Sequence, residues 1–222
     1  MYKKFIKRFL DLILGLMALI LLMPLMLIIY ILVRVKLGKP AIFKQERPGK
    51  DEKIFTLYKF RTMTDEKDEN GNLLPDEQRL TKFGKMLRST SLDELPELVN
   101  IIKGDMSIVG PRPERVEHVA KYTQDIPEFG YRLKVKGGLT GYAQVYGRYN
   151  TTSYDKLKMD LIYVVNYSLM LDFQIVLETV KIIFSKESTE GFTEENSKIM
   201  NEYGQELEAA RQEIAATRED NK

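Results

Sequence analysis

The chain has 222 residues and a formal net charge of +2 at pH 7, and 44% of its residues are hydrophobic. This small charge argues against a protein that binds nucleic acid through bulk positive charge, and no basic stripe with interleaved aromatic residues is present. The chain has no cysteine and a single histidine, His118. This excludes disulfides, thiol catalysis and metal sites built from several histidines. A bound metal would therefore be held by carboxylates and substrate oxygens, which are the ligands that Mg²⁺ prefers.

An uncharged run from Leu12 to Val33 has Pro24 near its middle and basic residues on both sides. The run is long enough to cross a bilayer, and no small-residue cleavage site follows it, so we expect an uncleaved membrane anchor and not a signal peptide. A spanning helix usually has more Lys and Arg on its cytoplasmic side, whereas both ends are basic here. Since proline bends or breaks a helix, the pattern indicates a segment that enters the membrane and returns. A spanning helix remains an alternative, because spanning helices tolerate proline.

The next elements are short. Strands are expected at residues 41–44 and 54–63, with a turn at 47–50 between them and an acidic loop over 64–76. Helical spacing follows at 80–87. A capping-box pattern of Ser91 and Glu94 predicts a helix that ends at Gly104.

The second half of the chain is predicted to alternate loops and helices. A buried strand at 107–109 leads into a rigid loop in which Pro111 and Pro113 flank Arg112. A glycine-rich loop is expected at 137–141, and helices are expected at 114–123, 154–167 and 173–184. Residues 194–222 show apolar positions spaced by three or four, which predicts one amphipathic helix. This helix is a candidate for homodimer formation, the alternative being a marginal, solvated helix.

Several residues have both a structural and a chemical interpretation. Asp93 and Glu94 suit the first turn of a helix because they favour its dipole. A helix N-terminus also binds phosphate, and an aspartate there is able to attack that phosphate beside a carboxylate that binds Mg²⁺. Arg112 is either a surface arginine in a turn or a rigidly aimed phosphate ligand.

Other candidates are weaker. Lys59 and Arg61 alternate on a predicted strand and so share one face, which is either an exposed edge or a phosphate-binding surface. The glycine-rich loop is either a plain turn or a site of close approach to a nucleotide. His118 is expected to be structural or exposed, and Asp160 and Asp172 are expected to act as caps or salt-bridge partners.

Taken in chain order, the motifs resemble one family closely. They are FKQERPG, YKFRTM, SLDELPEL, GDMSIVGPRP, GLTG and QVYGR, together with residues 163–172 and the anchor with its proline. These motifs are similar to those of the monotopic phosphoglycosyl transferases, bacterial sugar transferases that start lipid-linked glycan assembly. The resemblance extends over residues 3–187.

The resemblance implies a role for individual residues. Asp93 would be the nucleophile of a catalytic dyad, and Glu94 with Asp93 would hold Mg²⁺. Arg112, Lys59 and Arg61 would bind substrate phosphate. The nucleotide–sugar pocket would be formed by Gly138, Thr140, Gly141, Gln144 and Arg148. The chain departs from the family in having Met23 before Pro24, where a serine is usual, and in having Tyr149 between Arg148 and Asn150.

The expected fold is α+β and mainly helical. It comprises a re-entrant membrane helix-break-helix in residues 1–39, a small cytoplasmic α/β catalytic domain with short strands in 40–190, and a C-terminal amphipathic helix in 191–222. The expected activity is transfer of a sugar 1-phosphate from a UDP-sugar to undecaprenyl phosphate with release of UMP, through a covalent aspartyl-phosphosugar intermediate. This would be the first membrane step of capsule, exopolysaccharide or other glycoconjugate synthesis, at the cytoplasmic face of a bacterial cell membrane. The alternatives are a non-catalytic membrane scaffold and a glycosyltransferase that releases UDP.

Overall fold

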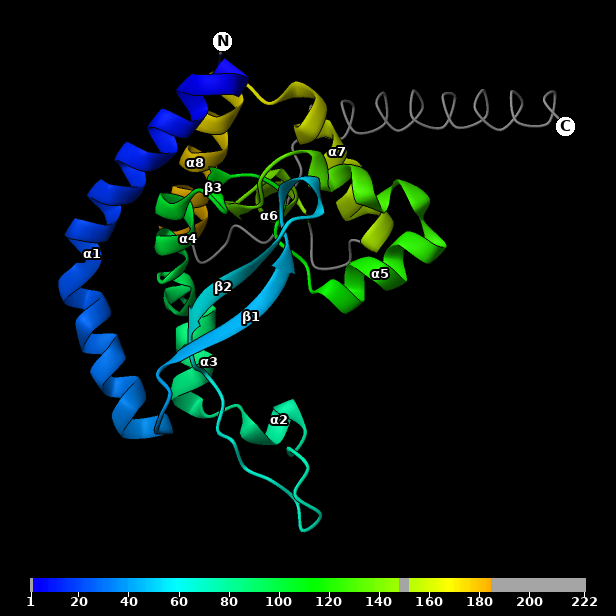
Figure 1. Cartoon of the computed structure of the whole chain (residues 1–222). Helices are drawn as coiled ribbons and strands as arrows, with labels where there is room; N and C mark the ends of the chain where they lie inside the picture. The colour runs from blue at the N-terminus through cyan, green and yellow to red at the C-terminus, as the bar shows by residue number, and fades with distance from the viewer. Residues whose placement is uncertain (1, 148–151, 185–222) are drawn as a thin grey trace, which may run out of the picture.

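The computed structural model describes residues 2–147 and 152–184, which are mainly helical with two small sheets, as predicted (Figure 1). Arg148 and the predicted tail helix lie outside the described residues, so the homodimer stays a prediction. The elements in chain order are η1 (Tyr2–Ile6), α1 (Lys7–Leu37), β1 (Ile42–Pro48), η2 (Lys50–Glu52), β2 (Ile54–Phe60), α2 (Asp76–Arg79), α3 (Lys82–Ser89), η3 (Leu92–Glu94), α4 (Glu97–Lys103), β3 (Ser107–Val109), α5 (Val116–Asp125), η4 (Pro127–Lys134), β4 (Gly138–Thr140), α6 (Tyr142–Tyr146), α7 (Ser153–Asn166) and α8 (Leu169–Phe184).

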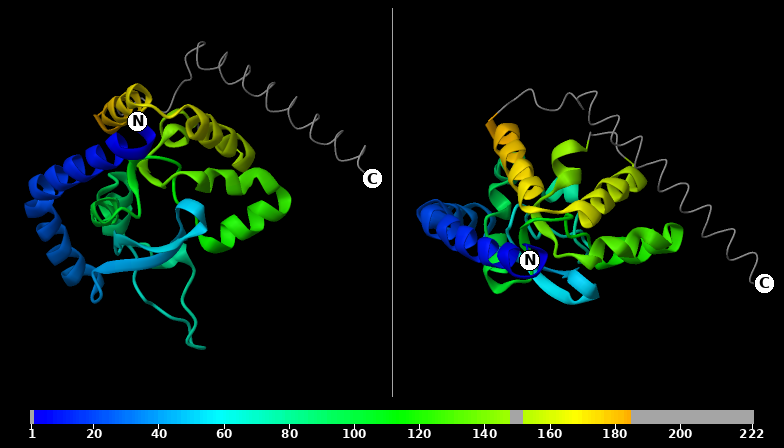
Figure 2. Two further views of the ribbon diagram at one scale, coloured as in Figure 1. Left: turned by 45° about the horizontal axis from the view of Figure 1, so that its top comes forward. Right: turned by 90° about the horizontal axis from the view of Figure 1, so that it is seen from above.

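The apolar N-terminal run forms one long helix, α1, which includes Pro24. Pro24 has no N–H to donate to the preceding turn, and Figures 1 and 2 show that α1 is bent near its middle. Only 11% of its most apolar stretch is buried, and the helix is long and apolar enough to cross a membrane. The core helix of a soluble protein would be mostly buried. This exposure distinguishes α1 from such a core helix and agrees with a membrane-associated protein.

The N-terminal end of α1 is bound to the rest of the protein by polar contacts. Lys7 Nζ pairs with Asp172 at 2.5 Å and donates to the carbonyl of Val109 at 3.0 Å. Arg8 donates to two carbonyls near the C-terminal end of α4, at 2.6 and 2.7 Å. The buried Asp11 accepts hydrogen bonds from the first two residues of β3. These contacts hold the start of α1 against β3, α4 and α8.

The C-terminal end of α1 packs on another part of the same body. Ile29, Val33 and Leu37 are buried with Phe60 of β2 and Leu87 of α3 in one hydrophobic cluster. The three α1 residues are spaced by four, so they form a single stripe along that end of the helix. Both ends of α1 therefore contact one body. One face of its apolar middle, with Ala18, Leu19 and Leu22, packs on the cluster that contains Leu98 and Ile101 of α4, and the rest of the middle is exposed.

The first sheet is an antiparallel hairpin of β1 and β2, with register from Ile42 opposite Phe60 to Pro48 opposite Ile54. The two strands were predicted, but their limits differ. β1 continues through Arg47 and Pro48, which were predicted to lie in a turn. Ladder pairing with β2 keeps these residues extended, and the chain reverses after Pro48 instead.

The second sheet consists of β3 and β4, which pair in parallel. β3 was predicted, whereas the expected loop at 137–141 was wrong in part because Gly138 to Thr140 form β4. A Cβ on Gly138 would lie 2.1 Å from the amide nitrogen of Gly110, and a Cβ on Gly141 would lie 2.1 Å from the Gly110 carbonyl oxygen. The glycines therefore allow two backbone segments to pack closely.

Helices α3, α5, α7 and α8 match predicted helices with shifts of a few residues at their ends, whereas α2, η4 and α6 were not predicted. α4 ends at Lys103, and Gly104 caps it with a φ of 91°, which favours glycine, so the predicted stop at Gly104 is confirmed. α7 and α8 pack on the β3–β4 sheet, and Met159, Tyr163 and Ile175 are the most fully buried of their cluster. Asp160 pairs with Arg132 at 2.6 Å and Asp172 with Lys7, which confirms both aspartates as salt-bridge partners.

Candidate active site

Asp93 lies in the short helical turn η3 (Leu92–Glu94), just before α4. The predicted capping box is wrong at this point. Ser91 adopts a left-handed backbone conformation, with φ of 54°, and its side chain caps nothing. The regular helix begins only at Glu97. The Glu94 side chain is therefore not used in a cap.

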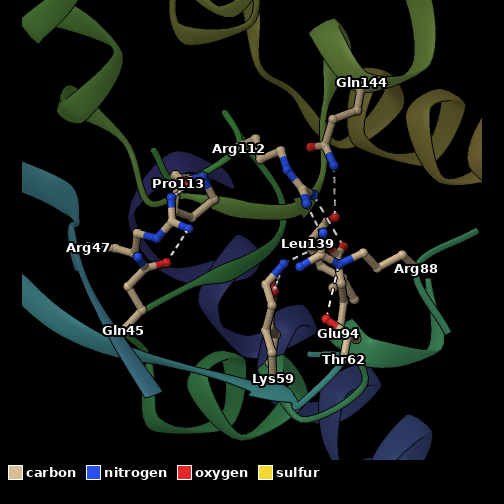
Figure 3. A network of polar contacts seen from close by, with 11 residues as sticks. Gln45, Arg47, Lys59, Thr62, Arg88, Glu94, Arg112, Pro113, Leu139 and Gln144 are labelled. Carbon is tan, nitrogen blue, oxygen red and sulfur yellow. Dashed lines mark hydrogen bonds and ion pairs between the residues drawn. The ribbon is translucent and has the colours of Figure 1, made fainter. Parts of the chain in front are cut away.

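Instead, Glu94 is held between two cations from distant parts of the chain. Its Oε1 accepts from Lys59 Nζ of β2 at 2.6 Å and from the Arg112 guanidinium. Its Oε2 accepts from Arg112 at 3.2 Å, so the arginine pair is bidentate (Figure 3). Burial favours the neutral acid, but the hydrogen bonds and charges of Arg112 and Lys59 outweigh it and lower the pKa of Glu94 to about 2. Glu94 is thus a carboxylate at neutral pH.

The neighbouring Asp93 has a different environment. It is 7% exposed, and burial raises its pKa although the charge of Lys59 acts in the opposite direction. Within the residues that the structure describes, no other side chain donates a hydrogen bond to its carboxylate. A carboxylate with a raised pKa that is not ion-paired is a better nucleophile than one that is ion-paired. The two acids are therefore suited to different tasks, one to attack and one to orient cations.

Glu97 is a third acid at the site, and no role was predicted for it from its motif. It is 3% exposed, and its Oε1 lies 3.2 Å from Lys59 Nζ. Burial raises its pKa to about 7, with the charge of Glu94 adding to the effect and that of Lys59 opposing it. An acid in the first turn of a helix is common because it favours the helix dipole. The sequence pattern therefore did not distinguish Glu97 from an ordinary helix-terminal acid.

Arg61 lies outside this group. β2 ends just before it, so the strand alternation that would place it beside Lys59 does not continue. Its guanidinium donates to the carbonyls of Lys39 and Met63, at 2.9 and 2.8 Å, and pairs with Asp65 at 2.5 Å. It ties the end of the hairpin to the chain that leaves α1.

The residues expected to form a nucleotide–sugar pocket are largely occupied by packing. Gly138 and Gly141 face the backbone of Gly110, as described above, and Thr140 shares a 2.7 Å hydrogen bond with Thr179. Gln144 Nε2 donates to the carbonyl of Leu139 at 3.2 Å (Figure 3). Its Oε1 is buried and has no hydrogen-bond partner among the described residues. Gln144 therefore has an acceptor that remains unused.

A cavity of about 160 Å³ lies on another side of Arg112. Its charged lining consists of Arg47, Lys59, Arg112, Arg115, Glu97 and Glu114. In Figure 3 Arg47 and Pro113 lie to one side of the Arg112–Lys59–Glu94 group, and Arg88 lies to the other. The site thus continues from the two acids into a space with more cations than acids.

A divalent metal has few protein ligands available here. Across residues 2–147 and 152–184, no three acidic or histidine side chains gather in a metal-binding arrangement. Asp93 and Glu94 offer hard carboxylate oxygens, and Mg²⁺ commonly binds one or two carboxylates together with phosphate oxygens and water. The donor types therefore fit Mg²⁺ when a substrate supplies further oxygens.

Comparison with known proteins gives a consistent result. A sequence model of the family described as "Bacterial sugar transferase" matches residues 2–186. The chain is 47% identical to the "Uncharacterized sugar transferase EpsL" of Bacillus subtilis, over 82% of this chain and 89% of that one. It is 38% identical to the "UDP-N-acetylgalactosamine-undecaprenyl-phosphate N-acetylgalactosaminephosphotransferase" of Aeromonas hydrophila, over 82% of this chain and 44% of that one.

A third relative is the "UDP-glucose:undecaprenyl-phosphate glucose-1-phosphate transferase" of Klebsiella pneumoniae, 41% identical over 78% of this chain and 39% of that one. The chain thus spans less than half the length of the two relatives whose names state a reaction. The family match covers both ends of α1, Asp93, Glu94 and the Arg112 loop. The chain belongs to the bacterial sugar transferase family.

Proposed function

We propose that this chain transfers a sugar 1-phosphate from a UDP-sugar to undecaprenyl phosphate and releases UMP. The relatives from Aeromonas and Klebsiella are named for transfers of this kind. The observation that carries the proposal is the meeting of Lys59, Glu94 and Arg112 beside the buried Asp93. Attack of an anionic nucleophile on a diphosphate ester requires nearby cations to offset the negative charge, and this group supplies both the nucleophile and the cations.

In the first step, an oxygen of the Asp93 carboxylate attacks the β-phosphorus of the UDP-sugar. The bond from that phosphorus to the bridging oxygen breaks, and UMP leaves with the electron pair. The sugar phosphate is then joined to Asp93 as an acyl phosphate. In the second step, a phosphate oxygen of undecaprenyl phosphate attacks the same phosphorus, releasing the carboxylate and forming undecaprenyl-pyrophospho-sugar. Two half-reactions of this kind predict ping-pong kinetics.

The cations would offset the negative charge that accumulates when one anion attacks another. Arg112 is 43% exposed at its side chain, so it is able to reach a ligand while still contacting Glu94. Glu94 keeps Lys59 and Arg112 together, which aims both donors at one place. Mg²⁺, held by Asp93 and Glu94 with substrate oxygens, would supply further charge neutralisation. Chelation by EDTA should then stop UMP release, and added Mg²⁺ should restore it.

We further propose that α1 is a re-entrant hairpin and that the site lies at the cytoplasmic face of the membrane. A helix that crosses the bilayer has its ends at opposite faces. Both ends of α1 contact one body here, so a crossing α1 would draw that body into lipid. A cysteine at position 3 should therefore resist an impermeant thiol reagent in intact cells, as should a cysteine at position 39. Labelling of position 3 alone from outside would refute the hairpin.

Asp93→Asn tests the chemistry. The amide is nearly isosteric but is a poor nucleophile, so UMP release should fall by at least about 10³-fold. Mass spectrometry of wild-type protein mixed with a UDP-sugar alone should show a sugar-phosphate adduct that the variant lacks. Asp125→Asn, at an exposed carboxylate, is the matched control. Substantial turnover by Asp93→Asn would contradict the assignment.

The identity of the products separates the alternatives. Release of UDP would indicate an ordinary glycosyltransferase, and absence of any nucleotide product across a panel of UDP-sugars would indicate a scaffold. The same panel identifies the sugar, because the substrate that gives the highest kcat/KM for UMP release is the preferred donor.

A further inference from the structure

The cavity beside Arg112 contains three side chains that the proposed mechanism does not use. Arg47 comes from β1, and Arg115 and His118 come from the start of α5. Each lines the same cavity as Lys59 and Arg112. Cationic and imidazole groups from two elements thus converge on a space that is also lined by the two cations that bind Glu94.

Arg47 is held rigidly in this place. Its Nη1 donates to the carbonyl of Pro113 at 2.9 Å, and its Nη2 donates to Gln45 Oε1 at 2.6 Å. Its Nε is buried and has no hydrogen-bond partner in the described part of the chain. A buried donor without an acceptor is costly, and an oxyanion in the cavity would offer it one.

The charges around Arg47 also favour an anion. Burial lowers its pKa, and the charges of Arg115 and Arg112 lower it further, against the opposing charge of Glu114. Three guanidinium groups that repel one another are stabilised by an anion between them. Arginine remains charged in proteins, so the repulsion is not relieved by loss of a proton.

The acids in the lining only partly balance these cations. Glu97 faces Lys59, and its pKa of about 7 leaves it partly protonated at neutral pH. Glu114 Oε2 lies 3.7 Å from His118 Nδ1. Lys59 and Arg112 also pair with Glu94 outside the lining. The two remaining arginines, Arg47 and Arg115, still outnumber the single carboxylate of Glu114.

We propose that Arg47, Arg115 and His118 form a second phosphate subsite, which binds the phosphate of the nucleotide that leaves. The assignment to a nucleotide rests on the proposed function. The cavity of about 160 Å³ accommodates a phosphoryl group and is smaller than the pockets that enclose whole ligands. Arg112 and Lys59 line both this cavity and the dyad, so two adjacent phosphates would share them.

The position of the subsite favours the nucleotide over the lipid phosphate. Figures 1 and 2 show α5 on the side of the molecule away from α1. The apolar surface of α1 is where a polyprenyl chain would lie. A soluble nucleotide would approach from the side of α5, where the lining is polar.

Binding of UMP to the full-length protein in nanodiscs tests the subsite without requiring turnover. Isothermal titration of Arg115→Gln/His118→Gln should show UMP affinity reduced by about tenfold or more, because charge-assisted bonds to phosphate are lost. Uridine, which lacks the phosphate, should bind equally to wild type and variant. Lys121→Gln, which removes an exposed cation from the same helix, should bind UMP within about twofold of wild type. Both mutated side chains are exposed, and circular dichroism would verify that the variants are folded.

Three results would overturn the proposal: absence of UMP binding by the wild type at millimolar concentration, equal UMP affinity in the double variant, or weakened binding of farnesyl phosphate with UMP binding unchanged. The last result would assign the residues to the lipid phosphate. The proposed function has its own test in UMP release by the wild type. If UMP binding weakens in the double variant but the wild type makes no UMP from any UDP-sugar, the function fails and the subsite stands.

Discussion

Replacing Glu97 with glutamine should remove a pH dependence of stability from this protein. Glu97 is 3% exposed, and its pKa rises from 4.5 to about 7 on folding because burial disfavours the charged form. Each pKa unit corresponds to about 1.4 kcal/mol. The folded state therefore favours the protonated acid by about 3 kcal/mol relative to the unfolded state.

The sign of the effect follows from which state binds the proton more tightly. Below pH 4.5 the acid is protonated in both states, and this contribution to the free energy of unfolding is fully present. Between pH 4.5 and about 7 the unfolded chain loses the proton while the folded protein keeps it, so the free energy of unfolding falls as pH rises. Above pH 7 the contribution is absent.

Denaturant unfolding in a nonionic detergent, followed by circular dichroism from pH 4.5 to 8, measures this effect. The difference in the free energy of unfolding between wild type and Glu97→Gln should change by about 3 kcal/mol over that range, in favour of the variant at high pH. Other titrating groups cancel in the difference. Glu77→Gln, at an exposed acid of α2, should give a nearly constant difference. A difference for Glu97→Gln that stays constant within about 0.5 kcal/mol would refute the reasoning.

Three further predictions concern packing, the α1 contacts and the nucleophile. Gly138→Ala should lower the free energy of unfolding by about 3 kcal/mol, because the new Cβ would lie 2.1 Å from a backbone atom. Gly130→Ala, which has open space around it, should change the free energy of unfolding by less than about 0.5 kcal/mol. Equal effects of the two substitutions in chemical denaturation would be contrary evidence. Asp172→Asn should lower the free energy of unfolding by about 3 kcal/mol by leaving the partly buried Lys7 ammonium without its carboxylate partner, and adding Lys7→Met should recover part of the loss in thermal unfolding. The proposed attack by Asp93 requires an ionised carboxylate, and burial raises the pKa of this group above its ordinary value of 3.8. As the pH is lowered, kcat/KM for UMP release should therefore begin to fall before pH 3.8 is reached, and a profile that is flat down to pH 4 would contradict this.

Local patterns predicted most of the regular elements because periodicity and turn residues act over short distances. The strand at 107–109 and the helix that ends at Gly104 were confirmed. The capping box failed because Ser91 and Glu94 satisfy the spacing rule while Glu94 has stronger partners in Lys59 and Arg112. A local hydrogen bond was outweighed by two cations that only the folded chain brings near.

The residues of the candidate site also fall into those predicted from sequence motifs and those that only the folded structure brought together. The acids at positions 93 and 94 and Arg112 were singled out from their motifs. The burial of Glu97 had no signal in the sequence. Strand alternation predicted that Arg61 would lie beside Lys59, but β2 ends at Phe60, one residue before Arg61. Arg47 was placed in a turn, and strand pairing put it in the cavity wall.

By itself, the sequence determined the family, the membrane-seeking helix and the chemical inventory, because composition and motif order need no three-dimensional contacts. The tertiary structure decided which of those groups meet. It placed both ends of α1 on one body, used the glycines at 138 and 141 for backbone packing, and joined Lys59, Glu94 and Arg112 across distant segments. These contacts depend on how elements pack against one another, and residues so far apart in the chain carry no shared local pattern from which that packing can be predicted.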